Sequence, residues 1–118
     1  MVSIKPGISV QYSGKVTIIT FTNDKILEQK DIQNLQDSII PVIEQAEEIK
    51  LVLDFKNVQF LSSSVLGLLL RISKKVYERD GQLRLCGISR KIFEIFKITR
   101  LNKIFDIYDD LEGALVGL

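Results

Sequence analysis

The sequence predicts an α/β protein: one domain over residues 1–118, with a mixed, largely parallel sheet of about five strands that opens with a β-hairpin and is covered by about four helices. Three observations lead to this fold class. The 118 residues are the length of one ordinary domain. The 46% hydrophobic and 26% charged residues are typical of a globular chain. Segments with the two-residue period of strands alternate with segments that have the three- and four-residue steps of helices, an order typical of parallel sheets.

The first half of the chain carries the predicted hairpin and the first helix. Apolar and polar residues alternate at 8–12 and again at 16–21, on either side of Ser13-Gly14, which indicates two antiparallel strands. Apolar residues at helical spacing then predict a helix over about 28–48, which Pro41 is expected to kink or split.

The second half alternates regularly between strands and helices. Strands are expected at 51–55, 83–88 and 104–108. Helices are expected between them at 65–80 and 92–101, and a short terminal helix is expected after Asp109-Asp110. The apolar run Leu51–Leu53 is typical of a central strand that is covered on both faces.

The amino-acid composition excludes the commonest catalytic mechanisms. The chain has no histidine and a single cysteine, Cys86, so neither a His-dependent nucleophile nor an ordinary zinc site can form. No glycine-rich phosphate loop is present. The carboxylates Asp106, Asp109 and Asp110 indicate a strand end followed by a helix start rather than a cation site. We therefore expect no enzyme, no metal and no cofactor.

Charge and hydropathy limit the partners and the location. The formal net charge of +1 gives no electrostatic reason to expect nucleic acid. The segment Met1–Gly14 lacks the apolar core of a secretion signal, and no apolar run approaches the ~20 residues that span a bilayer. A lone cysteine fits a reducing compartment. We expect a cytoplasmic protein without direct membrane insertion, either a monomer or a weak dimer.

The serine run Ser62-Ser63-Ser64 precedes the second predicted helix and has two interpretations. Serine is a preferred N-cap, so one of the three is expected to cap the helix. One serine suffices for that purpose, and the free N–H groups and positive dipole of a helix start also stabilise an added phosphate. A phosphoserine there would change an exposed surface without melting the helix. Capping alone and phosphorylation both remain open from the residues.

The second predicted helix carries more apolar surface than packing on a sheet requires. One apolar face is expected to pack on the sheet, and a second apolar line lies about 100° around the helix. The first consists of Val65, Leu69, Ile72 and Val76, and the second of Leu66, Leu70 and Tyr77. The second line is either covered by a neighbouring helix or forms an exposed docking patch beside the serines.

Three segments together carry a family pattern. From Leu51 to Gly67, an apolar strand ends in Asp, a short loop follows, and a serine run opens a helix. Residues 81–87 form the next strand of the pattern, and residues 96–105 with Ala114-Leu115 form its closing strand and helix. Together they resemble the STAS domain, a family that takes its name from sulfate transporters and anti-sigma factor antagonists. The resemblance covers nearly the whole chain and agrees with the predicted order of elements.

The resemblance implies a function. Free-standing members of the family bind an anti-sigma factor that is also a serine kinase; binding frees a sigma factor, and phosphorylation of the antagonist ends the binding. The phosphorylated serine of the family's Asp-Ser-Ser-Gly motif falls on Ser63, and Ser62 and Ser64 are less favoured. The expected partner-binding residues are Ser62, Ser63, Ser64, Val65, Leu66 and Leu70.

Two positions depart from the family pattern. Ser62 stands where the family usually has Asp, which removes a carboxylate beside the target hydroxyl. Val65 stands where the family usually has Gly, and its branched side chain narrows the approach of a partner's backbone.

Two other functions stay open. The chain could be a non-phosphorylated scaffold, or a partner subunit of a membrane transport system, with the same fold. Alternatively, it could be a small-molecule or nucleotide-binding module that uses helix N-termini as anion sites.

Overall fold

The computed structural model describes residues 2–118, which form one six-stranded sheet, one two-stranded sheet, four α-helices and a turn of 3-10 helix. The strands are β1 (Val2–Lys5), β2 (Ile8–Ser13), β3 (Val16–Phe21), β4 (Lys25–Ile26), β5 (Lys50–Asp54), β6 (Phe60–Leu61), β7 (Gln82–Cys86) and β8 (Asp106–Tyr108). The helices are α1 (Gln29–Glu44), α2 (Ser63–Glu78), α3 (Arg90–Ile98) and α4 (Leu111–Leu115), and the 3-10 turn is Leu101–Lys103.

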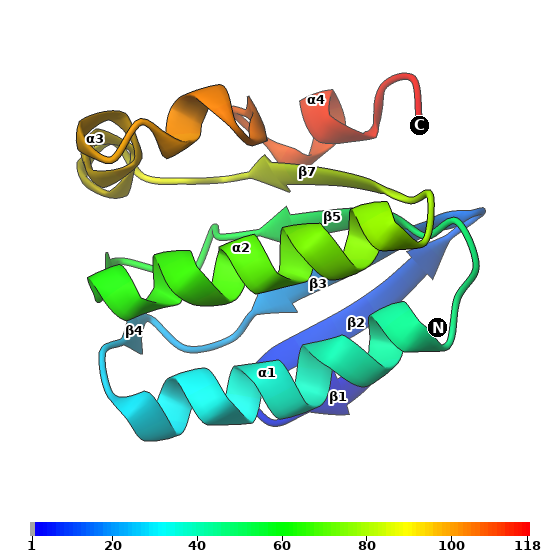
Figure 1. Ribbon diagram of the computed structural model, residues 1–118, viewed down its shortest axis with the longest axis horizontal. Helices are drawn as coiled ribbons and strands as arrows, with labels where there is room; N and C mark the ends of the chain where they lie inside the picture. The colour runs from blue at the N-terminus through cyan, green and yellow to red at the C-terminus, as the bar shows by residue number, and fades with distance from the viewer. Residues whose placement is uncertain (1) are drawn as a thin grey trace.

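The large sheet has the strand order β1-β2-β3-β5-β7-β8. The hairpin pairs β1 with β2 and β2 with β3 are antiparallel, and the three remaining pairs are parallel. The predicted mixed, largely parallel sheet is confirmed, with six strands in place of about five. Because β3, β5 and β7 run in the same direction, the loops that follow them meet at one edge of the sheet, where α2 also begins (Figure 1).

Helices cover both faces of this sheet, one face more completely than the other. The two long helices α1 and α2 lie side by side over one face (Figure 1), and α3 contributes Phe96 to the same core. The short helix α4 packs on the opposite face, over β5, β7 and β8, through Ala114. In the main core the rings of Phe21 and Phe55 lie 4.7 Å apart between centroids, which joins the ends of β3 and β5.

The first helix differs from its predicted form. It runs without a break through Pro41, so the expected split at that residue does not occur. Pro41 lies in the last turn, and the missing proline N–H removes one hydrogen bond close to the point where the helix ends anyway, at Glu44. The helix is therefore four residues shorter at its C-terminal end than the apolar pattern predicted.

Three strands were not predicted. The side chains of β1 are all exposed, so this strand has no buried face for an alternating pattern to reveal. The strands β4 and β6 have two residues each and pair with one another rather than with the large sheet. This small pair leads directly into α2 and shapes the site described next.

Candidate functional site

The loop from β5 to β6 carries the chain toward the serine run and is tied to the sheet by side chains. Asp54 is only 2% exposed, and its Oδ1 accepts a hydrogen bond from the backbone N–H of Lys56 at 3.0 Å. Asn57 Nδ2 donates to the carbonyl oxygen of Phe21 at 3.1 Å. The two bonds connect the loop to the ends of the neighbouring strands β5 and β3, so its course is fixed before the serines are reached.

The β4–β6 pair positions the residue that precedes α2. The carbonyl oxygen of Asp24 accepts hydrogen bonds from the backbone N–H groups of Gln59 at 2.7 Å and Phe60 at 3.1 Å. The carbonyl oxygen of Ile26 accepts one from the N–H of Ser62 at 2.9 Å. These three backbone bonds hold the entry to α2 against a segment more than thirty residues earlier in the chain.

Ser62 has the backbone of an N-cap without the side-chain bond that defines one. Its backbone is extended (φ −86°, ψ 162°) and its carbonyl oxygen accepts the N–H of Val65 at 3.0 Å. Its hydroxyl is buried and has no hydrogen-bond partner. One of the three serines therefore occupies the N-cap position, as predicted, but its side chain makes no capping hydrogen bond. Ser89, at the start of α3, does cap, because its Oγ accepts the N–H of Ile92 at 3.2 Å.

Ser63 and Ser64 are the first two residues of α2, and both are exposed. The helix therefore begins two residues earlier than predicted and includes two of the three serines. A helix start offers free N–H groups and the positive end of the helix dipole to a negative group. A phosphate on either hydroxyl would be stabilised electrostatically and would not require the helix to unwind.

The other expected partner-binding residues divide between core and surface. Val65 and Leu66 are buried, so they support the helix from beneath and present no side-chain surface in this structure. Leu70 is 42% exposed, and Tyr77 further along the same line is also exposed. The second apolar line of α2 is therefore covered at Leu66 and open at Leu70 and Tyr77.

An aromatic and two lysines that the sequence did not single out lie next to the serines. Phe60, on β6, is 38% exposed, and the ammonium groups of Lys25 and Lys91 lie 5.9 and 4.4 Å from its ring centroid. Leu27 is 51% exposed just beyond β4. These residues come from three separate segments, so no sequence spacing could have predicted the group.

Cys86, at the end of β7, is a buried thiol close to Asp54. Burial is the main cause that raises the pKa of Cys86 to about 12, and the negative charge of Asp54 and its hydrogen bond with the thiol raise it further. The thiol is therefore protonated at neutral pH, and a protonated buried thiol is a poor nucleophile. Its place is structural, in the smaller core beneath α4.

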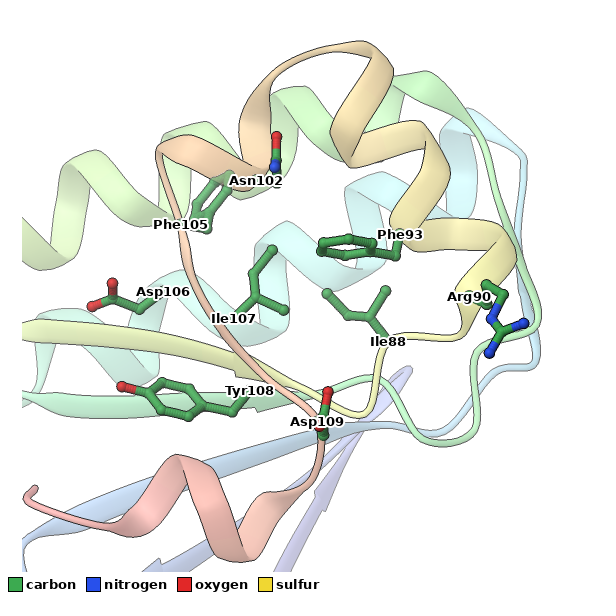
Figure 2. A pocket seen from close by; sticks show the side chains of 9 residues that line it. All are labelled: Ile88, Arg90, Phe93, Asn102, Phe105, Asp106, Ile107, Tyr108 and Asp109. Carbon is green, nitrogen blue, oxygen red and sulfur yellow. The ribbon is translucent and has the colours of Figure 1, made fainter.

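A surface cavity of about 570 Å³ lies between α3 and the edge strand β8 (Figure 2). It is lined by Ile88, Arg90, Phe93, Asn102, Phe105, Asp106, Ile107, Tyr108 and Asp109. The apolar side chains of Ile88, Phe93 and Ile107 face one another, with Arg90 and Asp109 nearer the rim. No residue of the serine run contributes to this cavity, so the two features are separate.

Two further observations concern the described part of the chain, residues 2–118. None of its helices is both long and apolar enough to cross a membrane. No group of three or more His, Cys, Asp or Glu side chains within the same range is placed to hold a metal ion.

A hairpin-opened, largely parallel sheet with two long helices on one face and a serine run at the start of the second defines an α/β domain of the STAS type. Residues 8–114 match the STAS domain, and the chain belongs to this family. The predicted resemblance is thereby confirmed.

Two relatives of known name are anti-sigma factor antagonists. The chain is 28% identical over 111 residues to an anti-sigma F factor antagonist of Paenibacillus polymyxa, a match that covers 94% of this chain and 93% of that protein. It is 31% identical over 81 residues to an anti-sigma-B factor antagonist of Bacillus subtilis, which covers 69% and 72% of the two chains.

Solved structures show the same fold. An anti-sigma-factor antagonist (STAS) domain protein from Planctomyces limnophilus superposes with a TM-score of 0.85 at 24% identity, over 92% of this chain and 95% of that one. The Bacillus cell fate determinant SpoIIAA in its phosphorylated form superposes with a TM-score of 0.67 at 17% identity, over 90% and 95%. At these identities the similarity extends to the fold alone.

Proposed function

We propose that this chain is a non-enzymatic, cytoplasmic anti-sigma factor antagonist of a bacterium. It binds an anti-sigma factor with serine kinase activity, which frees a sigma factor, and phosphorylation of Ser63 switches it off. The observation that carries the proposal is the exposure of Ser63 at the first position of α2. The relatives named as anti-sigma factor antagonists support the role, and the structure of SpoIIAA in a phosphorylated form supports the expectation that this fold can carry a phosphate.

The switch acts on the surface and leaves the fold unchanged. Phosphorylation adds about two negative charges and three acceptor oxygens at neutral pH. At the start of α2 these charges meet the favourable end of the helix dipole, so the helix persists. Hydrogen bonds of Asp54 and Asn57 tie the loop before the helix to the sheet, which disfavours a movement of the loop away from the new group. A partner that contacts Ser63 must therefore meet the phosphate directly.

Ser63 is favoured over its neighbours for physical reasons. The hydroxyl of Ser62 is buried, so a kinase cannot reach it without opening the start of α2. Ser64 is exposed but lies one residue further into the helix, about 100° around the axis. Ser63 combines exposure with the position closest to the end of the helix.

The test uses a purified anti-sigma factor with serine kinase activity from the same genome, together with ATP and magnesium. Intact-mass measurement is expected to show one added phosphate on the wild-type chain and none on Ser63→Ala. Ser64→Ala is the matched control and is expected to gain one phosphate as the wild type does. The phosphorylated chain is expected to bind the anti-sigma factor at least about tenfold more weakly than the unmodified chain.

Two outcomes would contradict the proposal in different ways. Stable binding without any phosphate transfer would favour a scaffold or a partner subunit of another assembly. Phosphate transfer that persists in Ser63→Ala and disappears in Ser64→Ala would move the switch to the second serine.

A further inference from the structure

The surface beside the serine run combines exposed apolar side chains with positive charge. We propose that the patch formed by Leu27, Phe60, Lys25 and Lys91, here called the basic-aromatic patch, determines partner specificity by docking an acidic segment of the anti-sigma factor. The inference rests on the proposed function, since it names the partner chemistry for the same end of the molecule.

The patch holds two positive charges on one aromatic ring. The ammonium groups of Lys25 and Lys91 both lie within 6 Å of the Phe60 centroid, at 5.9 and 4.4 Å, which is the range of a cation–π contact. Two exposed lysines held on one ring raise the local positive potential, which a negatively charged group of a partner would favour.

Neither lysine of the patch forms an ion pair within residues 2–118. The ion pairs within residues 2–118 are Lys74–Glu78, Lys75–Glu44 and Lys97–Glu94, and none includes Lys25 or Lys91. The exposed carboxylates closest to the patch in sequence, Asp24 and Glu28, form no ion pair with either lysine. The positive charge is thus available to carboxylates of a partner.

The small sheet beneath the patch holds its residues in place. Lys25 and Phe60 are paired across the β4–β6 ladder, and the residues after them, Ile26 and Leu61, are buried in the core. The carbonyl of Ile26 also accepts the N–H of Ser62, so patch and serine run share one framework. A surface that is already ordered loses little conformational entropy on binding. Figure 1 places β4, the start of α2 and α3 at the same end of the molecule.

The composition of the patch favours a protein segment over a nucleic acid. Phe60 is 38% and Leu27 51% exposed, and aromatic side chains are enriched at the centres of protein interfaces, which are surrounded by a polar rim. The whole chain carries a formal net charge of +1, far from the strongly basic balance of nucleic-acid-binding domains. The positive charge is local, as docking of a short acidic segment requires.

The patch also explains how phosphate on Ser63 would end binding. Ser63 follows Phe60 by three residues on a chain fixed by β6. A phosphate there places negative charge beside the acidic segment of the partner and offers the lysines a competing anion. Repulsion and competition act together, without a change of fold.

The experiment measures affinity for an anti-sigma factor from the same genome by calorimetry at low and at moderate salt. The double variant Lys25→Glu/Lys91→Glu is expected to bind at least about tenfold more weakly than wild type and to lose most of the salt dependence. Phe60→Ala is expected to weaken binding about tenfold. The matched controls are Lys15→Glu/Lys103→Glu and Tyr12→Ala, all at exposed positions outside the patch, and are expected to stay within about twofold of wild type.

The outcomes separate this inference from the function on which it rests. If wild type binds and both patch variants bind within about twofold of it, the patch is not the docking surface and the proposed function stands. If wild type does not bind, the proposed function fails and the inference falls with it. Thermal melting of each variant checks folding; if the Glu double variant does not fold, Lys25→Gln/Lys91→Gln removes the same charges and is expected to cost at least about threefold in affinity.

Discussion

Ser62 is the residue at which this chain departs most clearly, in physical terms, from an ordinary helix start. Its backbone has the N-cap conformation, yet its hydroxyl is buried and forms no hydrogen bond. A buried hydroxyl without a partner carries a desolvation cost of about 1–3 kcal/mol. Ser62 thus has the backbone conformation of an N-cap but does not provide the stabilisation that a side-chain capping hydrogen bond usually gives to a helix.

This difference predicts an unusual mutational result. Ser62→Ala is expected to change the free energy of unfolding by less than about 0.5 kcal/mol, or to raise it, because it removes an unpaired buried polar group. The matched variant Ser89→Ala is expected to lose about 1 kcal/mol, because Ser89 Oγ accepts the N–H of Ile92. Urea denaturation of both variants measures the two values. An equal loss in Ser62→Ala would mean that the hydroxyl does cap α2 in solution.

At the scale of elements, the start of α2 depends on a loop and a two-residue strand pair. Asn57 donates to the carbonyl of Phe21, and the β4–β6 pair supplies the hydrogen bonds of Phe60 and Ser62. Neither feature belongs to the large sheet. Their stability can therefore change locally while the rest of the fold persists.

Asn57→Ala is expected to loosen this entry selectively. Loss of one side-chain hydrogen bond, about 1 kcal/mol, is expected to raise amide hydrogen exchange at Phe60 and Ser62 by about fivefold. Exchange in the central strands β3 and β5 is expected to change less, and Gln33→Ala on the exposed face of α1 is the control. Hydrogen-exchange mass spectrometry or NMR measures the rates. Uniform acceleration across the sheet would show that Asn57 supports the whole fold rather than this entry.

The elements also divide by how well the sequence predicted them. The strands that bury one or both faces, such as β3 and β5, were predicted because burial imposes a regular apolar pattern. The exposed β1 and the two-residue β4 and β6 have no such pattern. Of the two expected effects of Pro41, a kink or a split, the split does not occur, because a proline in the last turn of a helix removes only one hydrogen bond near its end.

The candidate site was predictable only in part, for a related reason. Ser63 could be proposed as a candidate because it lies within the contiguous segment from Leu51 to Gly67 that resembles the family motif. Phe60, Lys25 and Lys91 come together only through the β4–β6 pairing and the position of α3, so they required the structure. The sequence also could not show that Leu66 is buried while Leu70 is exposed, since both belong to the second apolar line of α2 and differ only in what packs against them.

At the scale of the whole molecule, the free energy of unfolding is expected to depend on pH through the smaller hydrophobic core beneath α4. Cys86 lies between the sheet and α4, and burial raises the pKa of its thiol from 9.0 to about 12. The folded state therefore retains the thiol proton more strongly than the unfolded state. This contribution to stability is fully present below pH 9 and is lost as pH rises toward 12.

The comparison of wild type with Cys86→Ser isolates this effect. Between pH 9 and 12 the unfolding free energy of wild type is expected to fall more steeply, by up to about 1.4 kcal/mol for each pH unit, because the variant lacks the titrating thiol. Lysines and tyrosines titrate equally in both proteins and cancel in the difference. Chemical denaturation at several pH values provides the measurement, and parallel curves across the window would contradict the assignment.

The placement of the chain ends has a practical consequence. Figure 1 shows both ends on the side of the molecule opposite β4 and the start of α2. A fluorophore, an affinity handle or a sensor-chip tether attached at either end would therefore leave the serine run and the basic-aromatic patch facing the solution. Binding kinetics recorded on such an immobilised chain would be expected to match those of the free chain, so the molecule is well suited to capture partners from a mixture.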